Sequence, residues 1–316
     1  MRPYALIDLH CDTLTDCMYA GSNHPDTLDD PARTLSLTSI PKGVHWAQFF
    51  AVFVPDGLRG EKAVHFFDDS CANFDRQMRK FAPRVSPCRN VADMERAWAA
   101  GRTAAFLSVE NGSAFAGDLS RIGKMKRQGV CAVTLTWNGE NELGSGNATD
   151  RGLTDFGRAA VREMERCGIL ADVSHLNDAG LADVFETAEK PFLATHSNAR
   201  AVCAHRRNLT DAQIKEMVRR GCLIGLNYYG PFLRDGGEVR GLDDVYRHVA
   251  HFFDLGARKS LALGSDFDGA ALPPCLDSPE KAADLYEYLL SRGVSRQDAD
   301  GIFFENARTF LRKNLG

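Results

Sequence analysis

Short, almost continuously apolar runs alternate along this chain with longer segments that have the apolar periodicity of amphipathic helices. Runs with little polar alternation are typical of parallel strands that are covered on both faces. The predicted strands are residues 5–10, 46–54, 104–110, 130–137, 169–175, 192–196, 222–228 and 260–266.

The segments between these runs carry the signals of helices. Helices are predicted at residues 61–81, 91–100, 154–167 and 242–255. Thr210 and Gln213 have the spacing of a capping box at the start of another helix. Gly168, Gly221 and Gly256 each follow a helical segment and precede a strand, where a C-terminal glycine cap is expected.

Eight strand–helix units in series predict an α/β protein built as a closed (β/α)₈ TIM barrel of the metal-dependent hydrolase type. We expect one domain over residues 1–316, with helices at its C-terminal end. A doubly wound open sheet is the alternative. Most of the runs end in histidine, aspartate or glutamate, and in a barrel the carboxyl ends of all strands meet at one face. This feature favours the barrel.

Composition narrows the function classes. The chain of 316 residues has a formal net charge of −4, which gives no electrostatic reason to expect a nucleic acid or an anionic membrane as partner. Its nine cysteines form no C-x-x-C pair, and no apolar run approaches the roughly 20 residues of a membrane span. Asp8 comes too early for a signal-peptide core. We expect a cytoplasmic protein and leave a homodimer open.

The polar residues at the strand ends are candidates for a metal site. Each is weak evidence alone, because a lone histidine or aspartate at such a place is more often a structural hydrogen-bonding group. Together they supply the nitrogen and oxygen ligands that zinc favours, and a glutamate can bridge two cations with its two oxygens. The candidate ligands are His10, Asp12, Glu110, His175 and His196. Asp266 remains as a possible proton carrier, although a turn aspartate is its simpler interpretation.

Six sequence strings in this order resemble the membrane (renal) dipeptidase family, peptidase family M19 of the amidohydrolase superfamily, and its shorter bacterial members in particular. The strings are IDLHCDT from Ile7, SVENG from Ser108, GLTDFG from Gly152, DVSH from Asp172, THS from Thr195 and GSDFDG from Gly264. Many other amidohydrolases bridge their metals with a modified lysine on the fourth strand. Here that strand ends in Thr134-Leu135-Thr136-Trp137 without a lysine, which favours a glutamate bridge.

The resemblance implies two Zn²⁺ ions per chain, with other divalent metals as the alternative, and a dipeptide substrate. Carried over by position, His10 and Asp12 bind one ion, His175 and His196 bind the other, and Glu110 bridges them. Asp266 is then the general acid/base that serves a metal-bridging hydroxide, and Arg207 holds the substrate carboxylate. Tyr229 is a weaker candidate for the pocket wall.

One departure concerns the substrate. The family's dipeptidases often carry a histidine after Leu-Thr on the fourth strand, whereas this chain has Trp137 followed by Asn138. An indole N–H donates a hydrogen bond but accepts no proton. We expect Trp137 and Asn138 to contact substrate. The same binuclear site acting on an N-acyl amino acid, a lactone or a cyclic amide is the alternative, and a non-catalytic binding protein on the same barrel is a remote one.

Overall fold

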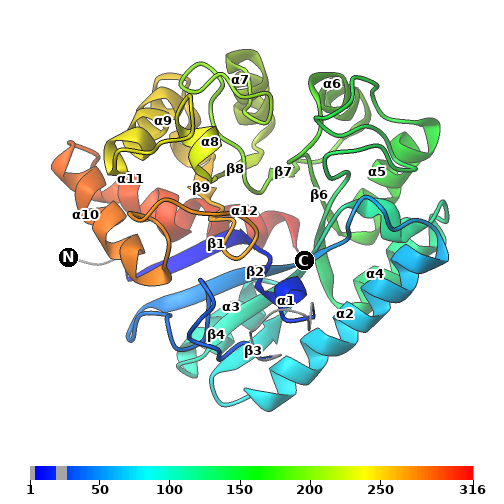
Figure 1. The fold of residues 1–316 in the computed structure, drawn as a ribbon, viewed down its shortest axis with the longest axis horizontal. Helices are drawn as coiled ribbons and strands as arrows, with labels where there is room; N and C mark the ends of the chain where they lie inside the picture. Colours follow the sequence, from blue (N-terminus) through cyan, green and yellow to red (C-terminus); the bar gives the residue numbers. More distant parts are fainter. Residues whose placement is uncertain (1–3, 19–26, 316) are drawn as a thin grey trace.

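The structure is a computed structural model that describes residues 4–18 and 27–315 (Figure 1). Its parallel sheet has the order β2-β1-β9-β8-β7-β6-β5-β4-β3, and an additional pairing of β2 with β4 closes eight of these strands into a barrel. The strands are β1 (Ala5–Cys11), β2 (His45–Phe53), β3 (Val85–Cys88), β4 (Thr103–Glu110), β5 (Val130–Thr134), β6 (Leu170–Asp172), β7 (Leu193–Ala194), β8 (Leu223–Leu226) and β9 (Leu261–Leu263). The predicted (β/α)₈ barrel is confirmed.

The ninth strand, β3, lies outside the barrel and was not predicted. It pairs with the first half of β4, from Thr103 to Phe106, while β5 pairs with the second half of β4, from Leu107 onward. Since β2 pairs with β4 over nearly its whole length, β3 and β5 share the other edge of β4. The strand is four residues long and contains Pro87, so it lacks the apolar run that marks the other strands.

Helices surround the strands, with α2, α4 and α5 on one side of the view in Figure 1 and α9, α10 and α11 on the other. The α-helices are α1 (Thr13–Asp16), α2 (Glu61–Lys80), α3 (Val91–Ala99), α4 (Ser120–Gln128), α5 (Asp155–Cys167), α6 (Asp178–Thr187), α7 (Asp211–Arg220), α8 (Gly230–Leu233), α9 (Leu242–Asp254), α10 (Ala282–Ser291), α11 (Arg296–Asp300) and α12 (Asn306–Asn314). The short turns η1 (Gly112–Phe115), η2 (Ala257–Lys259), η3 (Pro279–Lys281) and η4 (Gly301–Glu305) complete the described elements. Within the described residues, no helix combines the length and the apolar character that a membrane crossing requires.

The predicted helix ends are confirmed. The Thr210 side chain accepts a hydrogen bond from the backbone N–H of Gln213, whose own side chain accepts one from the backbone of Thr210. Gly168, Gly221 and Gly256 have φ values of 70°, 71° and 84°, in the left-handed region that favours glycine after a helix. After Gly168 and Gly221 the next strand begins within two residues, whereas η2 lies between Gly256 and β9.

The interior of the barrel is filled by apolar side chains from all eight of its strands. Phe49 and Phe106 stack there with ring centroids 4.7 Å apart. The strand residues in this buried cluster include Ile7, Phe49, Phe106, Ala132, Leu170, Leu193, Leu223 and Ala262. From α12, Phe310 and Leu311 pack into the same cluster. The barrel is therefore a packed core and not a pore, which leaves the ends of the strands as the place for a site.

A β-bulge in β1 sets the direction of the first candidate ligand. Asp8 pairs with Gln48 and Cys11 pairs with Phe50, so three steps along β1 match two along β2. Regular alternation would put Ile7 and His10 on opposite faces of the strand. The bulge instead lets Ile7 pack in the barrel interior while His10 also points inward, toward Glu110.

Candidate active site

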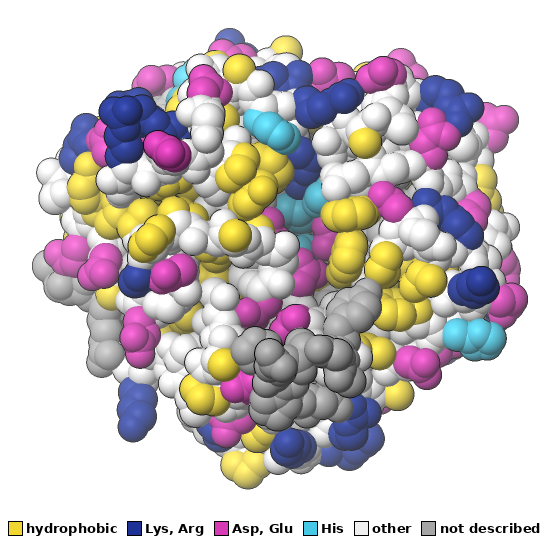
Figure 2. Space-filling model, viewed as in Figure 1, with side chains coloured by type: hydrophobic (Ala, Val, Ile, Leu, Met, Phe, Trp, Pro, Cys, Tyr) yellow, Lys and Arg dark blue, Asp and Glu magenta, His cyan; other side chains and the backbone are white. Residues whose placement is uncertain are grey.

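A cavity of about 490 Å³ lies at the carboxyl ends of the barrel strands. Figure 2 shows a hollow near the centre of this face in which histidine and acidic side chains are visible. The lining residues include Asp12, Glu110, His175 and Asp266 from the predicted site. The volume lies within the roughly 300–1,000 Å³ that is usual for small-molecule sites.

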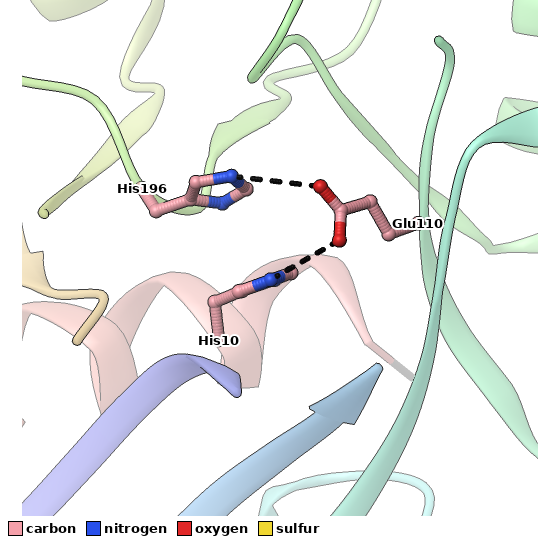
Figure 3. A group of neighbouring side chains, drawn as sticks. All are labelled: His10, Glu110 and His196. Carbon is pink, nitrogen blue, oxygen red and sulfur yellow. Dashed lines mark ion pairs between the residues drawn. The ribbon is translucent and has the colours of Figure 1, made fainter. Parts of the chain in front are cut away.

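Glu110, the last residue of β4, is the centre of the predicted ligand set (Figure 3). One of its oxygens, Oε2, lies 3.4 Å from Nε2 of His10. The other, Oε1, lies 2.8 Å from Nε2 of His175 and 3.9 Å from Nε2 of His196. Each oxygen of this buried carboxylate therefore faces a different group of histidines.

His175 and His196 form what we call the histidine side of the site. Nδ1 of His175 lies 3.0 Å from Oδ1 of Asn138, and Nδ1 of His196 lies 2.8 Å from the hydroxyl of Thr195. That hydroxyl donates its own proton to Asp172, so it accepts from His196. Both rings thus carry their proton on Nδ1, which leaves each Nε2 with a free lone pair.

The two free Nε2 atoms of the histidine side lie only 3.0 Å from each other. Two lone pairs at this distance repel unless a cation or a proton lies between them. Burial lowers the pKa of both His175 and His196 well below the ordinary value, so a proton is disfavoured. A metal ion satisfies the arrangement, because neutral imidazoles are the form in which histidine binds metals.

His10, Asp12 and Asp266 form the carboxylate side. Nε2 of His10 lies 3.5 Å from Oδ2 of Asp12 and 3.8 Å from Oδ1 of Asp266. Within residues 4–18 and 27–315, neither Nε2 of His10 nor Oδ1 of Asp12 has a hydrogen-bond partner, although both atoms are buried. Buried polar atoms without partners are rare and indicate a missing ligand or ion.

Electrostatics on the carboxylate side also fit a cation. Burial disfavours charge on His10, but the carboxylates of Glu110 and Asp12 outweigh that effect and hold its pKa well above the ordinary value. Burial, with the nearby charge of Asp12, raises the pKa of Glu110 to about 7, and burial raises the pKa of Asp266. Carboxylates that repel one another in this way are stabilised by positive charge placed between them.

The backbone near the ligands adopts conformations that non-glycine residues rarely have. His175 has a φ of 73° and Asp266 a φ of 67°, both in the left-handed region. Gly269 stands beside the carboxylate side, where an added Cβ would lie 2.0 Å from Oδ2 of Asp12 and 2.6 Å from Oδ1 of Asp266. Non-glycine residues in this region are often found where function fixes a side chain.

The predicted ligands lie at slightly different places than the sequence pattern indicated. His10 is in β1, but Asp12 follows the strand and is the N-cap residue of α1, so it is not a second strand residue on the same face. His175 lies three residues beyond β6, His196 two beyond β7 and Asp266 three beyond β9. The loops after short strands, rather than the strands themselves, bring these side chains together.

The predicted substrate residues occupy three different positions. Trp137 and Tyr229 line the cavity. Asn138 also lines it, but its Oδ1 is engaged by His175 and by the amide of Asn147, so this atom supports a ligand. Arg207 is 4% exposed and is not among the lining residues, but its guanidinium carbon lies 5.3 Å from the ring centroid of the lining residue Phe232.

Several residues of the site were not expected from the sequence. Asp172 accepts hydrogen bonds from the backbone and hydroxyl of Thr195 and from the hydroxyl of Thr134, and so ties together the ends of β5, β6 and β7. Phe53 and Phe232 line the cavity. The sequence offers one indication of Asp172, because this aspartate lies in an apolar run three residues before the candidate ligand His175. The two phenylalanines carry no signal that separates them from core residues.

Known proteins are similar to this chain in sequence and in fold. A protein described as lying in the pqqA 5′ region of Klebsiella pneumoniae is 30% identical over 236 residues, which are 71% of this chain and 87% of that protein. The solved structure of dipeptidase AC, a metallopeptidase of family M19, is 27% identical with a TM-score of 0.93, and the match covers 99% of both chains.

A second solved structure carries a substrate mimic. The metallopeptidase of Rhodobacter sphaeroides, solved with a phosphinate mimic of the dipeptide L-Ala-D-Ala, is 26% identical with a TM-score of 0.93 over 99% of this chain and all of that chain. The family model described as membrane dipeptidase, peptidase family M19, matches residues 1–314. This chain belongs to the membrane dipeptidase family and is a metal-dependent dipeptidase with an amidohydrolase-like fold.

Proposed function

We propose that the enzyme holds two zinc ions, one on each side of Glu110. His10, Asp12 and one oxygen of Glu110 hold the first, and His175, His196 and the other oxygen of Glu110 hold the second. Four of these side chains, together with Asp266, form two groups whose ligand atoms lie within 4.8 Å of one another, namely His10 with Glu110 and His196, and His10 with Asp12 and Asp266. Bound ions of this kind supply Lewis acidity and lower the pKa of water from about 15.7 toward 7.

Asp266 is proposed as the proton carrier. Its Oδ2 accepts a hydrogen bond from the amide of Asn227, which fixes the carboxyl group, and its Oδ1 faces His10 across the carboxylate side. Burial raises its pKa, which brings it closer to the range in which a carboxyl group both takes and returns a proton. Asp266 would take the proton of the attacking water and deliver it to the nitrogen of the leaving amine.

Arg207 is proposed to hold the carboxylate of the dipeptide. Its Nε is buried without a partner among the described residues, and burial lowers the pKa of its guanidinium to about 10. A buried cation without a bonded anion favours a ligand that brings a carboxylate. Its guanidinium carbon lies 5.3 Å from the ring centroid of Phe232, a residue that lines the cavity.

The observation that carries the proposal is the set of unsatisfied atoms around Glu110. Nε2 of His10, Nε2 of His175 and Nε2 of His196 all face the same buried carboxylate. Nε2 of His10 has no hydrogen-bond partner among the described residues, and the Nε2 atoms of His175 and His196 face each other at 3.0 Å. Two cations, each bound by one oxygen of Glu110, would give all three Nε2 atoms a partner.

The test combines elemental analysis with a substrate panel. Purified protein should contain two equivalents of zinc per chain and should hydrolyse L-L or L-D dipeptides faster than N-acyl amino acids, lactones and cyclic amides. A protein that binds zinc and turns over only the second group of substrates would support the alternative hydrolase. A protein that contains zinc and hydrolyses neither group of substrates would contradict both the dipeptidase and the alternative hydrolase. A zinc content of one equivalent per chain or none would contradict the binuclear site.

A further inference from the structure

Two pairs of aromatic side chains line the cavity above the metal centre. Phe53, the last residue of β2, and Trp137, which follows β5, meet edge to face with ring centroids 4.9 Å apart. Tyr229 and Phe232, which follow β8, also meet edge to face, with centroids 4.9 Å apart. We call the first pair the tryptophan wall and the second pair the tyrosine wall.

The order of strands places the two walls on opposite sides of the mouth. Around the closed barrel the order is β1, β2, β4, β5, β6, β7, β8 and β9. The strands β2 and β5 flank β4, and β8 is four strands from β4 in either direction. Glu110 and the other candidate ligands lie between the walls. A dipeptide whose peptide bond lies at the metal centre therefore extends toward one wall on each side.

The buried cation orients the dipeptide between the walls. Arg207 lies against Phe232, on the side of the tyrosine wall. If the substrate carboxylate is bound there, the carboxy-terminal residue lies beside the tyrosine wall and the amino-terminal residue beside the tryptophan wall. This step rests on the proposed function, in which Arg207 holds the carboxylate.

The charges of the cavity restrict which side chain suits the tryptophan wall. The described lining residues include five carboxylates and neither lysine nor arginine; the carboxylates are Asp12, Asp16, Glu110, Asp266 and Asp268. Two cations would offset part of this charge and Arg33 pairs with Asp16, but Asp268 lies outside the ligand set. An acidic side chain is therefore repelled, while aromatic faces bury apolar side chains well.

We propose that Phe53 and Trp137 form the subsite for the side chain of the amino-terminal residue, and that this subsite selects large apolar side chains over small or acidic ones. Trp137, which the family resemblance places where a histidine is expected, then acts in this enzyme as an apolar surface. Discrimination by a hydrophobic surface of this size is expected to be roughly 10- to 100-fold.

The experiment measures kcat/KM for dipeptides that share a carboxy-terminal alanine and differ in the first residue. The zinc-loaded wild-type enzyme should prefer Phe-Ala and Leu-Ala to Ala-Ala, and Ala-Ala to Glu-Ala. Trp137→Ala and Phe53→Ala should each reduce the ratio of Phe-Ala to Ala-Ala by about 10-fold or more, mainly through KM. Because the result is a ratio between two substrates, a fraction of inactive protein does not change it.

Three matched variants separate this role from others. Trp137→Phe keeps an aromatic surface and should hold the ratio within about 3-fold of wild type. Asp266→Asn should slow both substrates and leave the ratio unchanged. Phe232→Ala, in the tyrosine wall, should change the ratio of Ala-Phe to Ala-Ala instead.

Binding gives an independent readout. The chain has three tryptophans, and the indole N–H groups of Trp46 and Trp98 are bonded inside the protein, to Gln48 and to the backbone of Trp46. A phosphinate analogue of Phe-Ala should therefore change the emission of the wild type and not that of Trp137→Phe.

Unchanged substrate ratios in both alanine variants, with normal turnover of Ala-Ala, would overturn the subsite and leave the dipeptidase intact. An emission change that persists in Trp137→Phe would also overturn it. If the zinc-loaded wild type hydrolyses no dipeptide at all, the proposed function fails and the subsite fails with it.

Discussion

The two sides of the metal centre are held in place by different means. On the histidine side, His175 and His196 each donate a ring proton to a neutral oxygen, from Asn138 and Thr195, and their pKa values are lowered by burial. On the carboxylate side, Asp12 and Asp266 crowd around His10, whose Nε2 has no bonded partner among the described residues.

This difference indicates that hydrogen bonds within the protein orient the two rings of the histidine side, whereas the carboxylate side holds crowded acidic groups that a bound cation would stabilise. Hydrogen bonds from neutral groups fix a ring whether or not an ion is present. Acidic groups that share a buried space repel one another until positive charge is placed between them. The predictions below act on this contrast, in order of expected effect.

The largest effect is expected from Glu110→Ala, because the two oxygens of Glu110 face the two sides of the site. The variant should retain at most one equivalent of zinc and lose more activity than the roughly 10²–10⁴-fold that follows loss of a proton carrier. Elemental analysis and dipeptide kinetics measure both effects. The matched control is Glu140→Ala, which removes an exposed glutamate paired with Arg151 and should keep both equivalents. Two equivalents retained in Glu110→Ala would show that Glu110 does not bridge.

The next effect acts on the carboxylate side alone. Asp266→Asn preserves the size of the side chain and removes its capacity to carry a proton, so kcat should fall about 10²–10⁴-fold while two equivalents of zinc remain. Stopped assays on a dipeptide together with metal analysis would measure this. Full turnover would exclude Asp266 as the proton carrier.

A smaller effect is expected on the histidine side. Asn138→Ala removes the oxygen that accepts from His175, and zinc affinity or activity should fall roughly 10- to 100-fold. Asn138→Asp keeps an acceptor oxygen and should recover most of the loss. Titration with a zinc-buffered chelator measures the affinity. Wild-type affinity in Asn138→Ala would mean that His175 is oriented by other contacts.

The smallest expected effect is a local change in amide hydrogen exchange when the metal is removed. With zinc chelated, amide hydrogen exchange should increase more in residues 10–16 and 266–269 than in residues 172–177 and 193–197. The reason is that the second group keeps the hydrogen bonds of Asp172 and Thr195 without an ion. Equal increases in both groups would remove the distinction between the two sides.

The pattern of apolar runs predicted the eight barrel strands because each run is buried on both faces. It overestimated their length: residues 130–137 were predicted as one strand, but β5 ends at Thr134, after which the chain turns toward Trp137 and Asn138. Hydrophobicity does not distinguish a buried strand from the buried loop that follows it. The strand β3 was not predicted for a different reason, because it is short, contains Pro87 and lacks an apolar run.

The candidate ligands could be predicted because their chemistry is distinctive and they recur at strand ends. The residues that support them could not, since their roles depend on distances between loops. Asp172 acts through the hydroxyl of Thr195, and Gly269 matters because of the space beside Asp12 and Asp266. In the sequence, Phe53 resembles any other apolar strand residue. Only the closed barrel shows that its side chain lines the cavity.

The most direct test of the central claim is a crystal structure of the zinc-loaded enzyme with anomalous scattering measured at the zinc edge. The account predicts two anomalous peaks about 3.5–4 Å apart, one among His10, Asp12 and Glu110 and the other among Glu110, His175 and His196. A single peak, or peaks that Glu110 does not contact, would contradict it.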